Sequence, residues 1–204
     1  MKRRLGSLRI IGGRWRSRLL EFDAGAGVRP TPDRVRQTLF DWLSPLIDGA
    51  RCLDLFAGSG ALGFEALSRG AAQVCFVDSG ATQARAIRAA AERLGASAQI
   101  EVVQAEALAW LNSTSQRFDI VFLDPPYGSG LLPALLGALP RLLANGNRVY
   151  LEWPGSQTLA LPQGYRSLKE KRAGGVSYGL IGWLREPAEG GVQRMESGDA
   201  EKPI

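Results

Sequence analysis

Short apolar runs alternate with helical stretches over much of the chain. Strands are predicted near residues 51–56, 73–77, 99–103, 118–123 and 147–152, with amphipathic stretches between them. The run Ile120-Val121-Phe122-Leu123 is continuously apolar, as expected for a strand buried on both faces of a parallel sheet. Repetition of strand, turn and helix predicts a doubly wound α/β domain.

Two shorter patterns precede this core. Residues Leu8–Ile11 and Arg18–Phe22 resemble strands on either side of Gly12-Gly13, which predicts an exposed hairpin. A helix should follow, with Thr31 as its N-cap and Pro32 at its first position. Its apolar positions recur at helical spacing: Val35, Leu39, Trp42, Leu43 and Leu46.

The pattern changes again after Pro154. Tyr165–Lys171 and Ser177–Leu184 are predicted to pair as an antiparallel hairpin through Gly174-Gly175. Residues 186–204 are polar and glycine-rich, which predicts a disordered tail. Three segments are therefore expected: a basic arm over residues 1–30, a core domain over 31–185 and a tail over 186–204.

Composition narrows the possible chemistry. The 204 residues allow one sizeable core, and no apolar run approaches the ~20 residues that span a bilayer, so a cytoplasmic protein without membrane association is expected. Histidine is absent, which excludes Ser-His and Cys-His catalysis and histidine metal sites. Cys52 and Cys75 lie in apolar runs and are expected to be structural thiols, and no metal site is predicted.

Charge is concentrated at the N-terminal end. The net charge is +5, and residues 1–36 hold ten basic and three acidic side chains. A basic end on a near-neutral body is typical of a polyanion-binding protein, although a solvated tail would have the same composition. The residues expected to contact the polyanion, which the family resemblance described below implies to be RNA, are Arg14, Arg16, Arg18, Arg29 and Arg34.

A glycine-rich turn follows the first core strand. Gly58, Gly60 and Gly63 satisfy the GxGxxG pattern, which by itself is a weak indication of a dinucleotide. Asp54 just precedes the turn, where a carboxylate would repel a pyrophosphate and attract an ammonium group. A cationic amino-acid cofactor is therefore favoured over NAD.

Further carboxylates follow the next two strands. Asp78 is placed to accept hydrogen bonds from ribose hydroxyls, and Glu106 with the Ala107 amide to bind an adenine. Residues 51–152 thus resemble the S-adenosylmethionine site of class I methyltransferases, which have a Rossmann-like, mostly parallel seven-stranded sheet. The expected cofactor site comprises Asp54, Ala57, Gly58, Gly60, Asp78, Glu106 and Ala107.

The fourth strand ends in Asp124-Pro125-Pro126-Tyr127. An exocyclic base amine is a poor nucleophile until its hydrogens are held, and the Asp124 carboxylate and the Pro125 carbonyl can accept them. Pro125 and Pro126 restrict the backbone that carries this carbonyl, and Tyr127 offers a face on which a base can stack. These four residues are the predicted catalytic site, and it requires no strong general base.

This motif resembles that of the amino-methyltransferases, which act on DNA, RNA or glutamine. The segments Leu8–Arg16 and Arg29–Leu43 also resemble the N-terminal signature of the RsmD family, bacterial 16S ribosomal RNA guanine-N2 methyltransferases, and the similarity extends from residue 8 to residue 184. Glu106 stands where the family usually has Asp, and Asp78-Ser79 where an acidic pair is common.

The resemblance implies methylation of a guanine amine in 16S rRNA or the small ribosomal subunit, with S-adenosylmethionine as cofactor. The basic N-terminal hairpin would contact the RNA, and a monomer is favoured. Three alternatives stay open: an amino-methyltransferase for another RNA or DNA base, a non-catalytic RNA-binding assembly factor, and a nicotinamide-dependent oxidoreductase.

Overall fold

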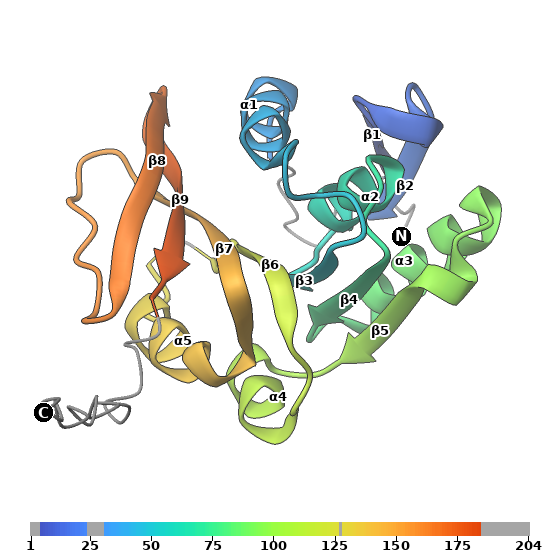
Figure 1. Ribbon diagram of the computed structural model, residues 1–204. Coiled ribbons are helices and arrows are strands. Elements are labelled where there is room, and N and C mark those ends of the chain that lie inside the picture. The colour runs from blue at the N-terminus through green and yellow to red at the C-terminus, as the bar shows by residue number, and fades with distance from the viewer. Residues whose placement is uncertain (1–4, 24–30, 127, 185–204) are drawn as a thin grey trace, which may run out of the picture.

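A computed structural model describes residues 5–23, 31–126 and 128–184. Their core is a seven-stranded sheet in the order β5-β4-β3-β6-β7-β9-β8 (Figure 1). Its strands are β3 (Arg51–Leu55), β4 (Gln73–Asp78), β5 (Ile100–Gln104), β6 (Phe118–Leu123), β7 (Leu143–Pro154), β8 (Tyr165–Ala173) and β9 (Val176–Trp183). The pairs from β5 to β7 are parallel, and those of β9 with β7 and β8 are antiparallel. This confirms the expected mostly parallel, doubly wound sheet.

Helices cover both faces of the sheet (Figure 1). One face packs against α1 (Asp33–Leu43), α2 (Ala61–Ser68) and α3 (Ala81–Leu94), and the other against α4 (Ala107–Ser113) and α5 (Leu132–Ala138). Short 3₁₀ helices occur in the described connections: η1 (Gly13–Trp15), η3 (Ser97–Gln99) and η4 (Pro140–Leu142). Because β3 and β6 are neighbours in the sheet but not in the chain, the winding reverses between them, and such a switch point is where doubly wound sheets bind ligands.

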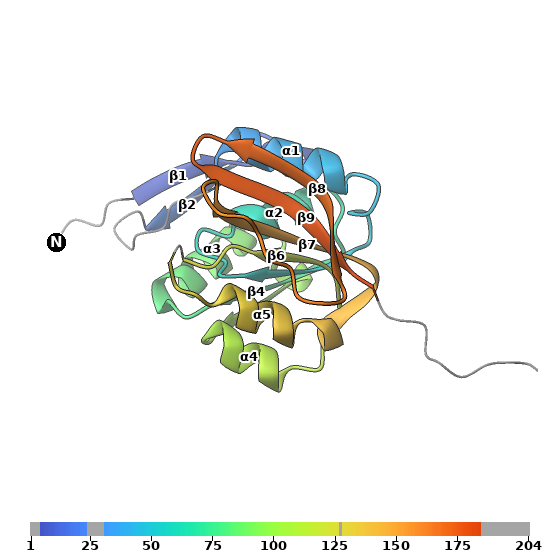
Figure 2. The same ribbon diagram turned by 90° about the vertical axis from the view of Figure 1, so that its left-hand side faces the viewer.

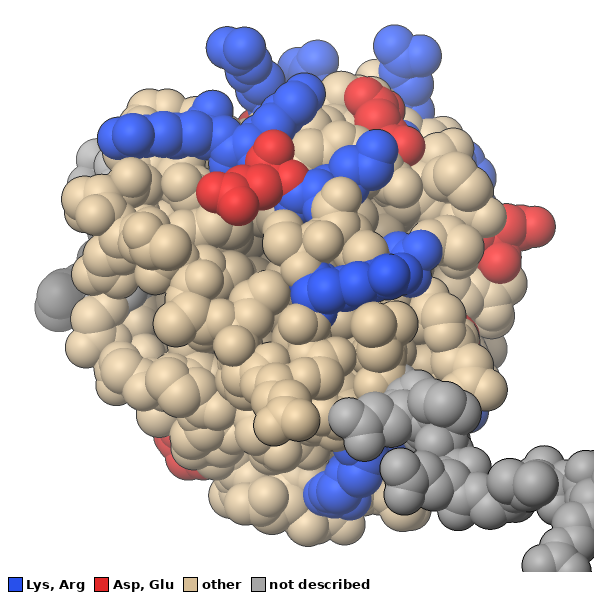
Figure 3. All heavy atoms as spheres, turned by 60° about the vertical axis from the view of Figure 1, so that its left-hand side comes forward, with Lys and Arg blue, Asp and Glu red and all other residues tan. Residues whose placement is uncertain are grey.

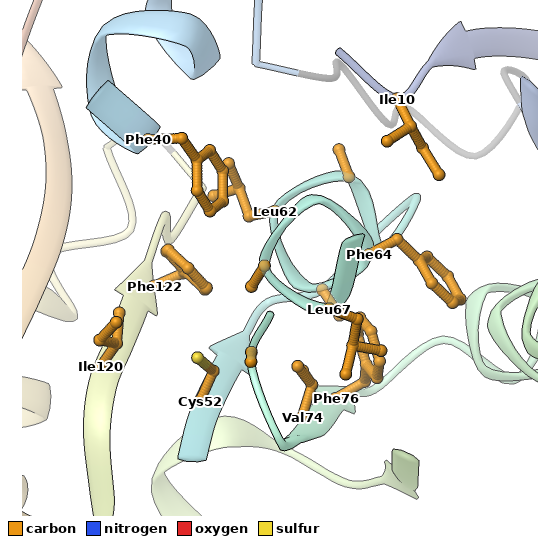
Figure 4. Packing of buried hydrophobic residues seen from close by; sticks show 14 of the residues in the cluster. Ile10, Phe40, Cys52, Leu62, Phe64, Leu67, Val74, Phe76, Ile120 and Phe122 are labelled. Carbon is orange, nitrogen blue, oxygen red and sulfur yellow. The ribbon is translucent and has the colours of Figure 1, made fainter. Parts of the chain in front are cut away.

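Helix α2 is the centre of the molecule. All eight of its residues are buried, because α1, α3 and the sheet surround it. Figure 4 shows Leu62, Phe64 and Leu67 of α2 among side chains from α1, from the sheet and from Ile10 near the N-terminus. Gly63 lets the helix approach the sheet, since a Cβ there would lie 2.2 Å from the Phe76 ring. The helix that follows the glycine-rich turn is thus held rigidly on every side.

The N-terminal hairpin is confirmed, with strands displaced by a few residues from the expectation. It comprises β1 (Leu5–Arg9) and β2 (Leu19–Asp23), and it packs over α2 and α3 (Figures 1 and 2). The buried Glu65 of α2 accepts hydrogen bonds from the backbone N–H groups of Ile11 and Gly12, both at 2.8 Å. Ser68 adds bonds to the backbone of Gly12 and Trp15. The turn of the arm is therefore attached directly to the core.

The start of α1 differs from the prediction. Pro32 occupies the N-cap and the helix begins at Asp33, so Thr31 is not the capping residue. Pro32 has an extended ψ of 147°, which places it outside the helix. The expected apolar position Leu46 is also wrong: it lies beyond the helix and is 40% exposed, whereas Phe40 is fully buried. The pattern in the sequence continues past the point where the backbone leaves the helical path.

The closing hairpin of β8 and β9 is confirmed, joined through Gly174-Gly175. Cys52 and Cys75 are buried free thiols, and burial raises the pKa of both, as expected for structural cysteines. Within the described ranges, no helix is long and apolar enough to cross a membrane, and no cluster of His, Cys, Asp or Glu has the geometry of a metal site. Arg29, Tyr127 and the predicted tail 186–204 lie outside the described residues.

Candidate active site

The glycine-rich turn connects β3 to α2 at the switch point of the sheet. Three of its residues have left-handed backbones, with φ of 72° at Phe56, 53° at Gly58 and 74° at Gly60. The N–H groups of Phe56 and Ala57 both donate to the Val77 carbonyl, 3.0 Å away, which ties the turn to the end of β4. A left-handed Phe is costly, so this bonding maintains a strained turn of defined shape.

Asp54 lies in β3 just before this turn and is only 4% exposed. Its Oδ2 accepts a hydrogen bond from the Gly63 N–H at 2.9 Å. Burial raises the pKa of Asp54 to about 8, and the nearby charge of Asp124 contributes to the increase. A carboxylate in this position is stabilised by any cation that approaches it.

Asp78 is the last residue of β4 and joins two loops. Its Oδ2 accepts a hydrogen bond from the Gly58 N–H and its Oδ1 one from the Gly80 N–H, both at 2.8 Å. An ionised carboxylate has about four lone-pair positions, so Asp78 retains the capacity to accept hydroxyl groups. It is half-buried at the carboxyl edge of the sheet, next to the glycine-rich turn.

Glu106 and Ala107 follow β5, the outer parallel strand. Glu106 is the N-cap of α4, and its exposed side chain makes no capping hydrogen bond to that helix. Ala107 is buried at the first helical position, where a backbone N–H has no partner within the helix. The three predicted cofactor carboxylates thus stand at the ends of three adjacent strands, β3, β4 and β5.

Asp124 directly follows β6, and its side chain is half-buried. Burial raises the pKa of Asp124 to about 7, and the neighbouring carboxylate of Glu152 adds to the shift. The Pro126 carbonyl accepts a hydrogen bond from the Ser129 N–H at 3.1 Å, so the two prolines lead into a turn. Asp124 is consequently a better proton acceptor than an ordinary aspartate near neutral pH.

Glu152 is a site residue to which the sequence assigned no role. Leu123 pairs with Leu151 in register, so Asp124, directly after β6, and Glu152, within β7, stand side by side. The Tyr150 hydroxyl donates a 2.6 Å hydrogen bond to Glu152 Oε1, and burial raises the pKa of Tyr150. One feature of the sequence could have indicated Glu152. Tyr150 and Glu152 alternate along the fifth predicted strand and so share a face, and that strand ends at the same edge of the sheet as the fourth.

The carboxylates of Asp54, Asp124 and Glu152 form a row across three adjacent strands. Asp54 pairs with Phe122, which packs on the face covered by α1 and α2, and Asp124 comes two residues after Phe122, just beyond the end of β6. Concentrated negative charge at the switch point suits a cationic ligand on one side and the N–H groups of a base on the other.

The predicted RNA-binding arginines lie apart from this row. Arg14, Arg16 and Arg18 are exposed at the turn of the N-terminal hairpin, and Arg34 is exposed at the start of α1. Arg14 stacks 4.0 Å from the centre of the Trp15 ring and donates a hydrogen bond to Gln99. At the opposite, amino edge of the sheet, a cavity of about 120 Å³ is lined in part by Arg51, Cys52 and Gln73. None of the predicted site residues lines that cavity.

Known proteins resemble this chain in both sequence and structure. The family profile described as "Conserved hypothetical protein 95" matches residues 8–182. The "Ribosomal RNA small subunit methyltransferase D" of Haemophilus influenzae is 42% identical over 180 residues, which cover 86% of this chain and 93% of that protein.

Solved structures of methyltransferases also resemble this chain. The one titled "Putative methyltransferase yhhF from Escherichia coli" is 40% identical, has a TM-score of 0.80 and aligns with 89% of this chain and 100% of its own. A structure titled "SMU.776, a putative methyltransferase complexed with SAH" has a TM-score of 0.62 at 15% identity and covers 72% of this chain and 48% of its own. The second likeness concerns the fold alone.

Proposed function

Since the chain belongs to the RsmD family of ribosomal RNA small subunit methyltransferases, we propose that it transfers a methyl group from S-adenosylmethionine to the N2 amine of a guanine in 16S rRNA. The observation that carries the choice of atom is the pair of adjacent carboxylates, Asp124 directly after β6 and Glu152 within β7. They offer hydrogen-bond acceptors side by side, and a guanine offers donors side by side.

The fit to guanine follows from its Watson–Crick edge. Guanine presents N1–H next to the N2 amine, whereas adenine presents an unprotonated N1 next to its amine. Asp124 can accept one N2–H, while Glu152, oriented by the Tyr150 hydroxyl, can accept the neighbouring donor. An adenine would turn its N1 lone pair toward a carboxylate, which costs hydrogen bonding and adds repulsion. The pair therefore favours guanine over adenine.

Asp124 has a second task in this proposal. As the amine formed its bond to the methyl carbon, the bond from that carbon to the sulfonium sulfur would break, its electron pair would stay on sulfur, and the amine nitrogen would have to lose a proton. A pKa of about 7, raised by burial and by Glu152, makes the Asp124 carboxylate a suitable acceptor at neutral pH. The Asp124 side chain would then both align the amine and accept its proton.

The residues around the glycine-rich turn fit the cofactor. Bound S-adenosylmethionine supplies an activated methyl group on a positively charged sulfonium. The buried Asp54 would hold its ammonium group, Asp78 its ribose hydroxyls, and Glu106 with the Ala107 amide its adenine. Gly58 and Gly60, with Ala57 between β3 and α2, would allow close approach of the backbone.

RNA contact is proposed for the exposed arginines of the hairpin and of α1. Arg14, Arg16, Arg18 and Arg34 would neutralise phosphates, and the attachment of the hairpin to Glu65 would keep them at a fixed distance from the catalytic row. Tyr127 is proposed to stack on the target base. Recognition by phosphate position and shape is typical of folded RNA.

The function is tested with unmodified 16S rRNA and with small subunits that lack the modification, each incubated with methyl-labelled S-adenosylmethionine. Label should appear on one guanine. Replacing that nucleotide by inosine, which lacks the N2 amine, should abolish labelling. Persistent labelling of the inosine substrate, or labelling on another base, would contradict the N2 assignment.

The catalytic role is tested with Asp124→Ala and Asp124→Asn. Both should lower kcat by about ten- to 150-fold, which corresponds to loss of one charge-assisted hydrogen bond of ~1.5–3 kcal/mol, with little change in cofactor affinity. Asn can accept an N–H but not a proton, so an Asn variant close to wild type would show that proton acceptance is not required. Asp119→Ala, on the same strand at the opposite edge of the sheet, is the matched control. A normal kcat in Asp124→Ala would overturn the assignment.

A further inference from the structure

Strand β8 is an edge strand with an unusual charge distribution. Arg166, Lys169, Lys171 and Arg172 are all exposed, and Glu170 is the one acidic residue among its nine. None of these basic residues belongs to the N-terminal arm. Figure 3 shows the face of the molecule that carries β8 and β9, where Lys and Arg side chains gather and acidic ones are fewer.

The register of the sheet connects this strand to the catalytic row. Glu152, next to Asp124, pairs with Tyr178 of β9, and Tyr178 pairs with Lys171 of β8. Three inter-strand steps of about 4.8 Å separate Asp124 from Lys171, so the two lie about 14 Å apart along the same edge of the sheet. A few nucleotides of RNA bridge such a distance.

Two lysines of β8 face the same side as the catalytic carboxylates. Lys169 and Lys171 pair with Leu180 and Tyr178, whose side chains are buried on the face covered by α1, and directly paired residues share a face. Arg172 instead pairs with Ser177, next to Trp153 on the other face, and donates a hydrogen bond to the Gly174 carbonyl. Arg172 therefore lies on the opposite face from the two lysines.

An aromatic side chain accompanies these lysines. Trp42 of α1 is half-buried and stacks on Tyr178, with ring centres 5.7 Å apart and planes at 29°. The Lys171 ammonium lies 5.9 Å from the centre of the Trp42 ring. Basic groups combined with a partly exposed aromatic ring form a surface suited to a nucleic-acid backbone and its bases.

We propose that Lys169, Lys171 and Trp42, together called the β8 surface, bind RNA close to the target nucleotide, the two lysines through its phosphates and Trp42 through a base. This proposal rests on the proposed function, and it adds a second contact region to the N-terminal hairpin. Figure 1 shows α1 between β8–β9 on one side and the hairpin on the other, so RNA held by both regions would pass over α1. The RNA backbone would then be bound on both sides of the target nucleotide, and the target base could reach Asp124.

Lysines on an edge strand have another recognised effect, because they prevent the strand from pairing with the edge of a second molecule. The two explanations differ in what they predict. Phosphate binding predicts a change in the salt dependence of RNA affinity, whereas edge protection predicts self-association when the lysines are removed.

The experiment uses the full chain and whichever substrate, unmodified 16S rRNA or the small subunit, the wild type methylates. Affinity of Lys169→Ala/Lys171→Ala is measured over a range of salt concentrations. The slope of log affinity against log salt should fall by ~0.7–0.9 for each lost phosphate contact. Cofactor affinity and the thermal midpoint should stay at wild-type values. Lys169→Arg/Lys171→Arg should restore the slope, because the charge is kept.

Arg51→Ala/Arg117→Ala is the matched control. It removes two exposed charges at the amino ends of β3 and β6, on the opposite edge of the sheet, and should leave the slope nearly unchanged. An unchanged slope in the β8 variant, with or without self-association, would overturn the proposal, as would an equal decrease in the control. A wild type that methylates neither substrate would refute the proposed function instead, which separates the two failures.

Discussion

Among single residues, Asp54 lowers the stability of the folded protein and is proposed to bind the cofactor. Its carboxylate is almost completely buried and receives one backbone hydrogen bond, from Gly63. The charges of Asp124 and Asp78 add repulsion, although burial is the largest cause of its raised pKa. An apolar or neutral side chain would be more stable in this position, so we interpret the charge as present for a cationic ligand.

This interpretation predicts opposite effects of Asp54→Asn on stability and on binding. The folded-state pKa of about 8 lies above the usual value, so the folded protein binds the proton more tightly and Asp54 destabilises it increasingly as pH rises from about 4 to 8. The variant should be more stable than wild type at pH 8, by at least ~1 kcal/mol, and the difference should shrink toward pH 5.

Chemical denaturation of the cofactor-free proteins at pH 5, 6.5 and 8 measures this difference. Calorimetric titration with S-adenosylmethionine should show weaker binding by the same variant, because the contact with the ammonium group is lost. A stability difference that does not change with pH would show that Asp54 is ionised throughout. Unchanged cofactor affinity would remove Asp54 from the binding site.

Among the secondary-structure elements, α2 links the hairpin, the glycine-rich turn and the sheet. Its position depends on Gly63, where a Cβ would lie 2.2 Å from the ring of Phe76 and 2.9 Å from Val74. Both neighbours are buried, so neither can move away without disturbing the core. The third glycine of the GxGxxG pattern is therefore required by packing rather than by contact with a ligand.

Gly63→Ala should destabilise the protein by about 1–3 kcal/mol through overpacking. Gly137→Ala provides the control, because Gly137 is also helical, is exposed and has no atom from outside its own helix turn within 4 Å of the added Cβ. That variant should be stabilised, by up to about 1 kcal/mol, since alanine is the better helix former. The two free energies of unfolding are compared by urea titration. Equal effects of the two substitutions would mean that α2 can shift to accommodate the methyl group.

Over the whole molecule, positive charge surrounds an acidic centre. Hairpin and β8 carry exposed basic residues on either side of α1, while the row Asp54, Asp124 and Glu152 lies at the switch point. Such an arrangement would draw the RNA backbone to the periphery and keep phosphates away from the carboxylates. Electrostatic attraction and repulsion would then orient the RNA, with its phosphates at the basic surfaces and a base toward the carboxylates, before any specific contact forms.

Replacing Arg14, Arg16 and Arg18 together by Ala should weaken RNA binding and lower its salt slope by roughly 2.1–2.7, which is ~0.7–0.9 per lost contact. Cofactor affinity should not change, because these arginines lie on the hairpin and not at the glycine-rich turn. The control replaces Arg51 and Arg117, at the amino ends of β3 and β6, together with Arg148, which pairs with Ile120 inside the sheet. If the hairpin variant keeps the wild-type salt slope, these arginines are ordinary solvated surface and do not bind RNA.

Local patterns in the sequence were enough to predict the alternation of strands and helices, both hairpins, the glycine-rich turn after β3 and Asp124 after β6. These features are legible because each depends on neighbours a few residues away: apolar periodicity, turn-forming glycines and the restrictions of proline. The same local signals failed at the start of α1, where Pro32 caps the helix in place of Thr31. A hydrophobic pattern that continues along the sequence does not show at which residue the backbone leaves the helix.

Contacts between residues that are far apart in the sequence could be identified only from the tertiary structure. Glu152 lies beside Asp124 because of the register between β6 and β7, and Glu65 anchors the hairpin through bonds to residues more than 50 positions earlier. The raised pKa values of Asp54 and Asp124 likewise arise from burial and from nearby carboxylates, Asp124 and Asp78 near Asp54 and Glu152 near Asp124. Long-range register and desolvation depend on how the whole chain packs, so no window of sequence contains them.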